Sequence, residues 1–270
     1  VRINVLNAVK NPHFGIAIFR EDGVYCFGPN TVFDGHDIPE LKPGKAWFAL
    51  VFYKVLLAPG EYRVSVAVWD RNETVAFNYR SGYYPLTVNG PCIKKNWLLD
   101  IPYRFQPGSF SGRINLPEAE EALGSSLLSK QCGSAVVYEG IKIESVKIFD
   151  AYNKETGILF TNLPANITVN FSSATLPHKH FYLWVGIYRD DGIYCQGIYK
   201  KFRKGESFSM RFPSLSLLPG GYKIAAGVWD DRRREFIICH HGLCSFRMVF
   251  NRQDHGTIYL EHRWTWSMPK

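Results

Sequence analysis

The chain contains an internal repeat, and this duplication limits its possible folds more than any other feature. Residues 1–88 can be laid against residues 167–249, with two long runs matching in the same order. The first run pairs residues 13–28 with 183–197, and the second includes a Trp-Asp pair at its end in both copies. Because the matches keep their order, each copy is expected to form a structural unit of similar design.

Each repeat has the pattern of short β-strands. Apolar residues alternate through Ile16 and Ile18, as in a strand with one buried face. An Asp-Gly pair at residues 22–23 and a Pro-Gly pair at residues 59–60, each repeated in the second copy, are typical of tight turns. Without helical periodicity inside either repeat, the pattern predicts an all-β protein with two antiparallel β-sandwich domains in tandem, of jelly-roll or immunoglobulin-like type.

A stretch with strong helix formers separates the repeats. Residues 117–123 begin with proline and carry acidic residues in the first turn, as a helix start prefers. We therefore predict a first module at residues 1–116, a linker with a short helix at 117–136 and a second module at 137–270. The first module is expected to lack its first strands, since nothing like residues 140–148 precedes Val1. The length of 270 residues fits two domains, although a single large β domain would also fit.

Charge and cysteine content narrow the function classes. The net charge of +8 favours acidic partners, but the basic residues are dispersed and the densest run, residues 232–234, is short. No nucleic-acid-binding motif is present, so nucleic acid is not an expected partner. Cys26 and Cys195 fall at equivalent strand positions, which favours buried thiols in a reducing compartment. Neither a signal peptide nor an apolar run of membrane-spanning length is found in the sequence.

Several short elements resemble one known family. They are the Asp-Gly hairpin followed by Gly-x-Asn-Thr at residues 28–31, Leu-x-Pro-Gly-x-Tyr at 57–62, and a closing Gly-x-x-x-Leu-x-His-x-Trp element at 256–264. Together they are similar to the Wzt C-terminal domain, the carbohydrate-binding module on the ATP-binding subunit of O-antigen ABC transporters. The second repeat departs from the pattern at residues 197–200, and the first has a weaker closing element at 112–116.

This resemblance implies a function and a location. The family's β-sandwich, often a homodimer, binds the end of an undecaprenyl-linked surface polysaccharide in the cytoplasm, at the inner face of the membrane through its partners. Binding couples the glycan to export by the transporter. Transporter or glycosyltransferase domains are the partners expected upstream. The alternative is a structural module that docks onto a glycosyltransferase or another polysaccharide-assembly enzyme and has no sugar site of its own.

Candidate glycan-binding residues are aromatic rings beside polar groups, because a sugar has an apolar face and a polar rim. Such pairs occur at the end of the Trp-Asp strand, beside the Asp-Gly hairpin and near the C-terminus. The residues are Trp69, Asp70, Tyr25, Arg20, Trp229, Asp230, Tyr194, Arg189, His262 and Trp264. Each has a structural alternative: tryptophans that fill a core, aspartates that cap turns, hairpin residues that are only surface, and a C-terminal edge that packs against a partner subunit.

Catalytic and metal-binding motifs are missing from the sequence. It has no P-loop, no Gly-x-Ser-x-Gly and no His-Glu-x-x-His motif. Residues 239–241 with Cys244 offer two cysteines and two histidines, but a strand would direct neighbouring side chains to opposite faces. We therefore expect a binding module rather than an enzyme, with no cofactor and no metal.

Overall fold

The computed structural model describes residues 1–90, 97–102, 104–105, 141–173, 181–201 and 208–267. All regular structure in these ranges is β-strand, which confirms the predicted all-β class. The predicted linker helix, the module boundaries at 116 and 137, and the weak closing element at 112–116 lie outside the described residues. Within the described ranges, no helix is long and apolar enough to cross a membrane.

Contacts between residues divide the chain into two units. Unit 1 comprises Val1–Leu56, Gly60–Asn89 and Asn251–Lys270, and unit 2 comprises Leu57–Pro59 and Gly90–Phe250. Each unit contains one repeat. The division differs from the prediction that residues 137–270 form one module, because the chain after Phe250 pairs with strands of unit 1.

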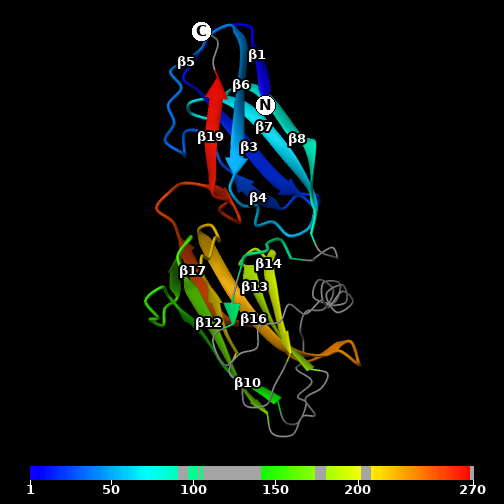
Figure 1. The fold of residues 1–270 in the computed structure, drawn as a ribbon. Coiled ribbons are helices and arrows are strands. Elements are labelled where there is room, and N and C mark those ends of the chain that lie inside the picture. The colour runs from blue at the N-terminus through cyan, green and yellow to red at the C-terminus, as the bar shows by residue number, and fades with distance from the viewer. Residues whose placement is uncertain (91–96, 103, 106–140, 174–180, 202–207, 268–270) are drawn as a thin grey trace. The chain divides into compact units, whose positions relative to one another are not determined.

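Unit 1 is a sandwich of two antiparallel sheets and a small β-ladder (Figure 1). The three-stranded sheet runs in the order β1 (Arg2–Val5), β6 (Gly44–Phe52) and β19 (His262–Ser267). The five-stranded sheet runs in the order β18 (His255–Gly256), β4 (Tyr25–Gly28), β3 (Pro12–Arg20), β7 (Gly60–Asp70) and β8 (Ala76–Val88). The ladder pairs β2 (Val9–Lys10) with β5 (Glu40–Leu41).

The core of unit 1 lies between its two sheets. Phe14 of β3 and Phe48 of β6 are fully buried and stack with ring centroids 4.1 Å apart. Val66 and Val68 of β7 join the same cluster. Because side chains alternate along a strand, the residues between these apolar ones point to the outer face of the five-stranded sheet. The predicted alternation therefore determines which side chains form the core and which point to the outer face.

Unit 2 repeats this design with a four-stranded and a five-stranded sheet. One sheet runs in the order β10 (Ile141–Phe149), β12 (Ala165–Ser173), β15 (Phe208–Phe212) and β9 (Arg104–Phe105). The other runs in the order β11 (Ile158–Phe160), β17 (Glu235–Val249), β16 (Gly220–Asp230), β13 (Phe181–Arg189) and β14 (Tyr194–Lys201). All pairings are antiparallel except the parallel pairing of β11 with β17.

Each unit is closed by the segment that follows the other unit's repeat. In unit 1, β19 pairs with β6 and places Trp264 opposite Leu50. In unit 2, β9 pairs with β15 and places Phe105 opposite Met210. By these two registers, the described residues between 97 and 105 (97–102 and 104–105) are the counterpart of the closing element at 256–264. We call residues 97–105 and 251–267 the closing segments. Each closing segment follows one repeat in the sequence but completes the unit of the other repeat, and we call this arrangement the exchange of closing segments. It explains why the C-terminal strand belongs to unit 1.

A buried carboxylate holds the closing segment of unit 1. Asp34 accepts hydrogen bonds from His262 Nε2 at 2.8 Å and from Trp264 Nε1 at 2.6 Å, and it forms an ion pair with Arg252. Its side chain is 8% exposed. Burial acts to raise the pKa of Asp34, but these donors outweigh burial and hold the pKa below its usual value. All three donors belong to the closing segment, so Asp34 fixes that segment to the unit.

Replacing this acceptor is expected to destabilise unit 1. Asp34→Asn places an amide N–H₂ among donors and removes the charge opposite Arg252, which should cost about 3 kcal/mol of unfolding free energy. Urea-induced unfolding followed by tryptophan fluorescence measures the change. Asp37→Asn is the control, because Asp37 is 77% exposed and its loss should cost less than about 0.5 kcal/mol. Equal effects of the two variants would contradict the assignment.

A second buried carboxylate, which lies in the closing segment itself, makes unit 1 sensitive to pH. The Asp254 side chain is wholly buried, 3.4 Å from Arg252 Nε, and burial raises its pKa to about 6. The folded state therefore keeps its proton at a higher pH than the unfolded state does. Stability should fall by about 2 kcal/mol as pH rises from about 4 to about 7. Asp254→Asn should flatten this part of the profile, as measured by urea unfolding across that range; an unchanged profile would refute the assignment.

Candidate functional site

The outer face of the five-stranded sheet in unit 1 has a floor of small side chains. Gly15 and Ala17 of β3 are partly exposed, while Ser65 and Ala67 of β7 are buried. These residues alternate with the core residues of the same strands and so point away from the core. The floor is therefore accessible over Gly15 and Ala17, whereas Ser65 and Ala67 are covered.

Six side chains surround this floor, and we call them the polar–aromatic cluster. They come from β3, β4, β7, β8 and two loops: His13, Tyr25, Asn30, Trp69, Glu73 and Tyr79. The rings of Trp69 and Tyr79 lie 5.9 Å apart. Glu73 Oε1 accepts a hydrogen bond from Asn30 Nδ2 at 2.9 Å and lies 3.4 Å from His13 Nε2. The cluster thus combines aromatic surface with hydrogen-bonding groups.

The turn between β7 and β8 places Glu73 in this cluster. The Asp70 carboxylate accepts hydrogen bonds from the backbone N–H groups of Thr74 and Val75, both at 2.7 Å, and from the Thr74 hydroxyl at 2.6 Å. Glu73 itself has a φ of 57°, a left-handed conformation that is uncommon for residues other than glycine. Asp70 therefore organises the turn, and the turn presents Glu73 to Asn30 and His13.

Burial sets the protonation of the neighbouring groups. It lowers the pKa of His13, with Glu73 acting against that change, so His13 is a neutral imidazole at neutral pH. It raises the pKa of Tyr25 to about 12, with further contributions from Glu73 and Tyr79. Tyr25 is therefore a neutral phenol. The Glu73 carboxylate is the one charged side chain of the cluster.

In unit 2 the equivalent face is filled by its own aromatic side chains. The strand registers put bulky rings where unit 1 has small or polar residues: Trp184 for Gly15, Tyr199 for Asn30 and Phe236 for Ala76. Trp184 is fully buried, and a Cβ added at Gly186 would come within 2.5 Å of its ring. Trp229, the counterpart of Trp69, is 1% exposed. Unit 2 therefore has no open floor at this position.

The predicted hairpin residues are engaged within their own turns. Arg20 donates to both carboxylate oxygens of Asp22, and Arg189 forms the same kind of pair with Asp191. Both arginines are thus used by the hairpin. Tyr25 stacks on Phe19 with centroids 4.7 Å apart and belongs to the polar–aromatic cluster.

The remaining predicted residues are occupied by the fold. The Tyr194 hydroxyl accepts a hydrogen bond from Trp184 Nε1 at 2.9 Å. Asp230 is buried and accepts from the backbone N–H groups of the following turn. His262 and Trp264 both bind Asp34, and their side chains offer almost no exposed surface. Of the predicted residues, the structure brings Trp69 and Tyr25 together at one open face.

Sequence reasoning missed four members of the cluster: His13, Asn30, Glu73 and Tyr79. Asn30 stabilises its own turn, since its Oδ1 accepts the backbone N–H of Phe33 at 2.8 Å. Its Nδ2, however, donates to Glu73. The signal that could have found the open face is the pairing of Gly15 in one repeat with Trp184 in the other.

Comparisons with known proteins match the first repeat to one family model. The family model for the Wzt C-terminal domain matches residues 1–98. Residues 1–98 therefore contain a Wzt C-terminal-like domain, which confirms the resemblance for the first repeat. The match covers less than half of the chain. A search of curated proteins found no match.

Two solved structures are similar at low identity. One is the crystal structure of the C-terminal domain of Wzt, with 14% identity, a TM-score of 0.37, and coverage of 45% of this chain and 80% of that one. The other is a β-glucuronidase of Bacteroides uniformis, with 11% identity, a TM-score of 0.26, and coverage of 96% of this chain and 26% of that one. Because both TM-scores are below 0.5, neither similarity establishes a fold or a function for this chain.

The two equivalent tryptophans are expected to differ in their contribution to stability. Trp229→Ala removes a buried ring from a packed aromatic cluster and should cost about 3–5 kcal/mol. Trp69→Ala removes a partly exposed ring and should cost less than about 1.5 kcal/mol. Urea unfolding of the two variants tests this difference. Similar losses would mean that the Trp69 ring is as tightly packed as its counterpart.

Proposed function

We propose that this chain is a carbohydrate-binding module and that unit 1 holds the binding site. The site is the polar–aromatic cluster with its floor at Gly15 and Ala17. The observation that carries the proposal is the open outer face of unit 1, beside which Trp69 and Tyr79 lie partly exposed. The ligand class is a bacterial surface polysaccharide of the O-antigen kind, as expected of a Wzt C-terminal-like domain.

The chemistry of the cluster suits a sugar. An aromatic ring packs against the apolar face of a pyranose, while hydroxyl groups at the rim need donors and acceptors. Trp69 and Tyr79 supply the rings, and Tyr25, Asn30 and Glu73 supply polar groups around the same floor. The small side chains of Gly15 and Ala17 allow a ring to approach the sheet closely.

Unit 2 serves as a scaffold in this proposal. Trp184 and Phe236 occupy the space that a sugar would need, and Trp229 is buried beneath them. The duplication has therefore kept the strand framework in both copies and left the binding face in one. The proposed role requires no catalytic group from either unit.

The cellular role proposed is coupling of the glycan to export. Recognition of an undecaprenyl-linked polysaccharide in the cytoplasm would license its transfer to an ABC transporter, and the chain would reach the inner face of the membrane through its partners. The family match over residues 1–98 supports this setting. Transporter or glycosyltransferase domains remain the proposed partners, with a homodimer as one possible assembly.

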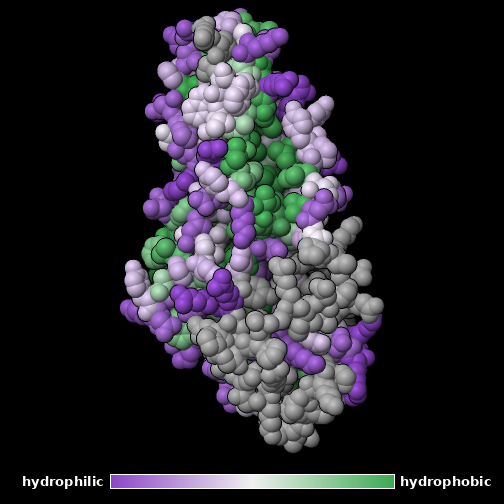
Figure 2. Space-filling view, viewed as in Figure 1, coloured by the Kyte–Doolittle hydropathy of each residue, from purple (hydrophilic) through white to green (hydrophobic). Residues whose placement is uncertain are grey.

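Docking onto a polysaccharide-assembly enzyme is the second candidate function. Figure 2 shows a stripe of hydrophobic residues on unit 1. Exposed apolar or aromatic side chains also occur on both sheets: Val51 of β6 in the three-stranded sheet is 38% exposed, and Phe77 and Tyr83 of β8 in the five-stranded sheet are 45% and 62% exposed. Exposed apolar surface of this kind is typical of interaction sites. The binding experiment below separates this candidate from a glycan site.

Filling the open face is expected to abolish glycan binding. Gly15→Trp places a ring at the position of Trp184 in unit 2; a Cβ at Gly15 meets only Asn30 Cβ at 3.9 Å, and urea unfolding of the variant checks that its fold is kept. Binding of the purified chain to the O-polysaccharide of its own organism, measured by isothermal titration calorimetry, should be lost. Trp69→Ala should weaken binding about tenfold or more, since stacking on a ring is worth about 1.5 kcal/mol.

Trp47→Ala is the matched control, because Trp47 is 44% exposed on β6 of the other sheet. Its affinity should equal that of the wild type. If the folded wild type binds no native polysaccharide, docking becomes the leading function. If Gly15→Trp binds as well as the wild type, the glycan site lies elsewhere.

A further inference from the structure

The charge of the proposed site differs in sign from that of the whole chain. The chain carries a net charge of +8, which favours an acidic partner. The polar–aromatic cluster instead contains one carboxylate, Glu73, and no side chain that is positive at neutral pH, because burial keeps His13 neutral. The two arginines that are nearest to the cluster on the flanking turn and strand, Arg71 and Arg80, make their contacts outside the cluster. Arg71 pairs with Asp37 at 3.2 Å, and Arg80 lies over the ring of Tyr83 at 5.6 Å.

The Glu73 carboxylate is held in place and still has acceptor capacity. Asn30 Nδ2 and His13 Nε2 both approach Oε1, and both side chains are more than nine-tenths buried. Within the part of the chain that the structure describes, no group donates to Glu73 Oε2. The Glu73 side chain is 45% exposed. An ionised carboxylate has about four acceptor positions, so it can accept further hydrogen bonds from a ligand.

We infer that Glu73 determines the specificity of this site by accepting hydrogen bonds from sugar hydroxyls and by excluding a glycan unit that carries negative charge. This inference rests on the proposed function of unit 1. Hydroxyl groups donating to a carboxylate form charge-assisted hydrogen bonds, which are stronger than neutral ones. A carboxylate or phosphate on the sugar would instead face Glu73 with like charge, and no basic side chain of the cluster would compensate.

The comparison with unit 2 supports a role for Glu73 in the ligand site. The equivalent turn of unit 2, residues 231–234, carries Arg232, Arg233 and Arg234 in place of a glutamate. That turn lies beside a face filled by Trp184 and Phe236. Four residues after the tryptophan, unit 1 thus has Glu73 where unit 2 has Arg233, and the fold of the turn does not require a glutamate at this position.

An array of neutral and acidic bacterial polysaccharides, probed with the full chain and with Gly15→Trp, tests the inference. Neutral glycans should be bound, acidic ones should not, and Gly15→Trp should abolish the signal. Binding of acidic glycans that Gly15→Trp abolishes would overturn the role of Glu73 while leaving the proposed function intact. Absence of any binding by the folded chain would overturn the proposed function itself.

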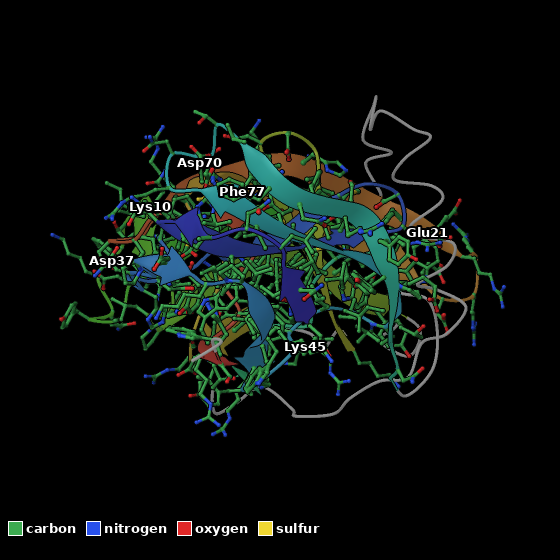
Figure 3. All side chains as sticks on the ribbon, turned by 90° about the horizontal axis from the view of Figure 1, so that it is seen from above. Lys10, Glu21, Asp37, Lys45, Asp70 and Phe77 are labelled. Carbon is green, nitrogen blue, oxygen red and sulfur yellow. The ribbon has the colours of Figure 1, made fainter. Side chains whose placement is uncertain are left out.

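Substitutions at Glu73 then test the residue directly on the best neutral glycan of the array. Glu73→Gln keeps an oxygen that can accept from Asn30, so the fold should persist, but the affinity should fall about tenfold with the loss of the charge. Glu73→Lys should lose the neutral glycan and gain acidic ones. Glu21→Gln is the control; Figure 3 shows Glu21 at the opposite end of the sheet from Asp70, which begins the Glu73 turn. An affinity for Glu73→Gln within about twofold of wild type would refute the inference.

Discussion

The exchange of closing segments is the constraint on which the rest of this structure depends. Without β19, strand β6 would be an unpaired sheet edge, and Trp264 would be missing from the core of unit 1. Asp34 makes the exchange specific, because a buried carboxylate is tolerated only where donors surround it. The donors His262 and Trp264 come from the far end of the chain. A single acidic side chain therefore joins the beginning and the end of the sequence into one unit.

Much of this fold could be predicted from the sequence, because strands and turns leave local signals. The alternation around Ile16 and Ile18 and the Asp-Gly and Pro-Gly pairs correctly indicated antiparallel sandwiches. The exchange could not be predicted in the same way. Periodicity shows that a strand has one apolar face, but either closing segment could complete either unit on that criterion. The choice depends on long-range contacts such as the one between Asp34 and His262, which no local pattern contains.

The candidate site was likewise predictable only in part, because some of its features are local in the sequence and others depend on long-range contacts. Trp69-Asp70 and Trp229-Asp230 are identical pairs at equivalent positions, so the pairs themselves do not distinguish the two units. Their surroundings differ because a residue on the neighbouring strand is Gly15 in one unit and Trp184 in the other. The role of Glu73 was hidden for a related reason. It depends on a turn conformation at Asp70 and on buried partners contributed by two other segments.

The exchange also has a consequence for synthesis of the protein on the ribosome. Unit 1 begins first, yet its last strand, β19, is made after the whole of unit 2. Unit 2 already has its closing segment, residues 97–105, before its own repeat emerges. At ordinary translation rates the first repeat waits on the order of ten seconds or more with one sheet edge open. The first repeat to leave the ribosome is thus the last to be completed, and a nascent chain that stops short of β19 cannot finish unit 1.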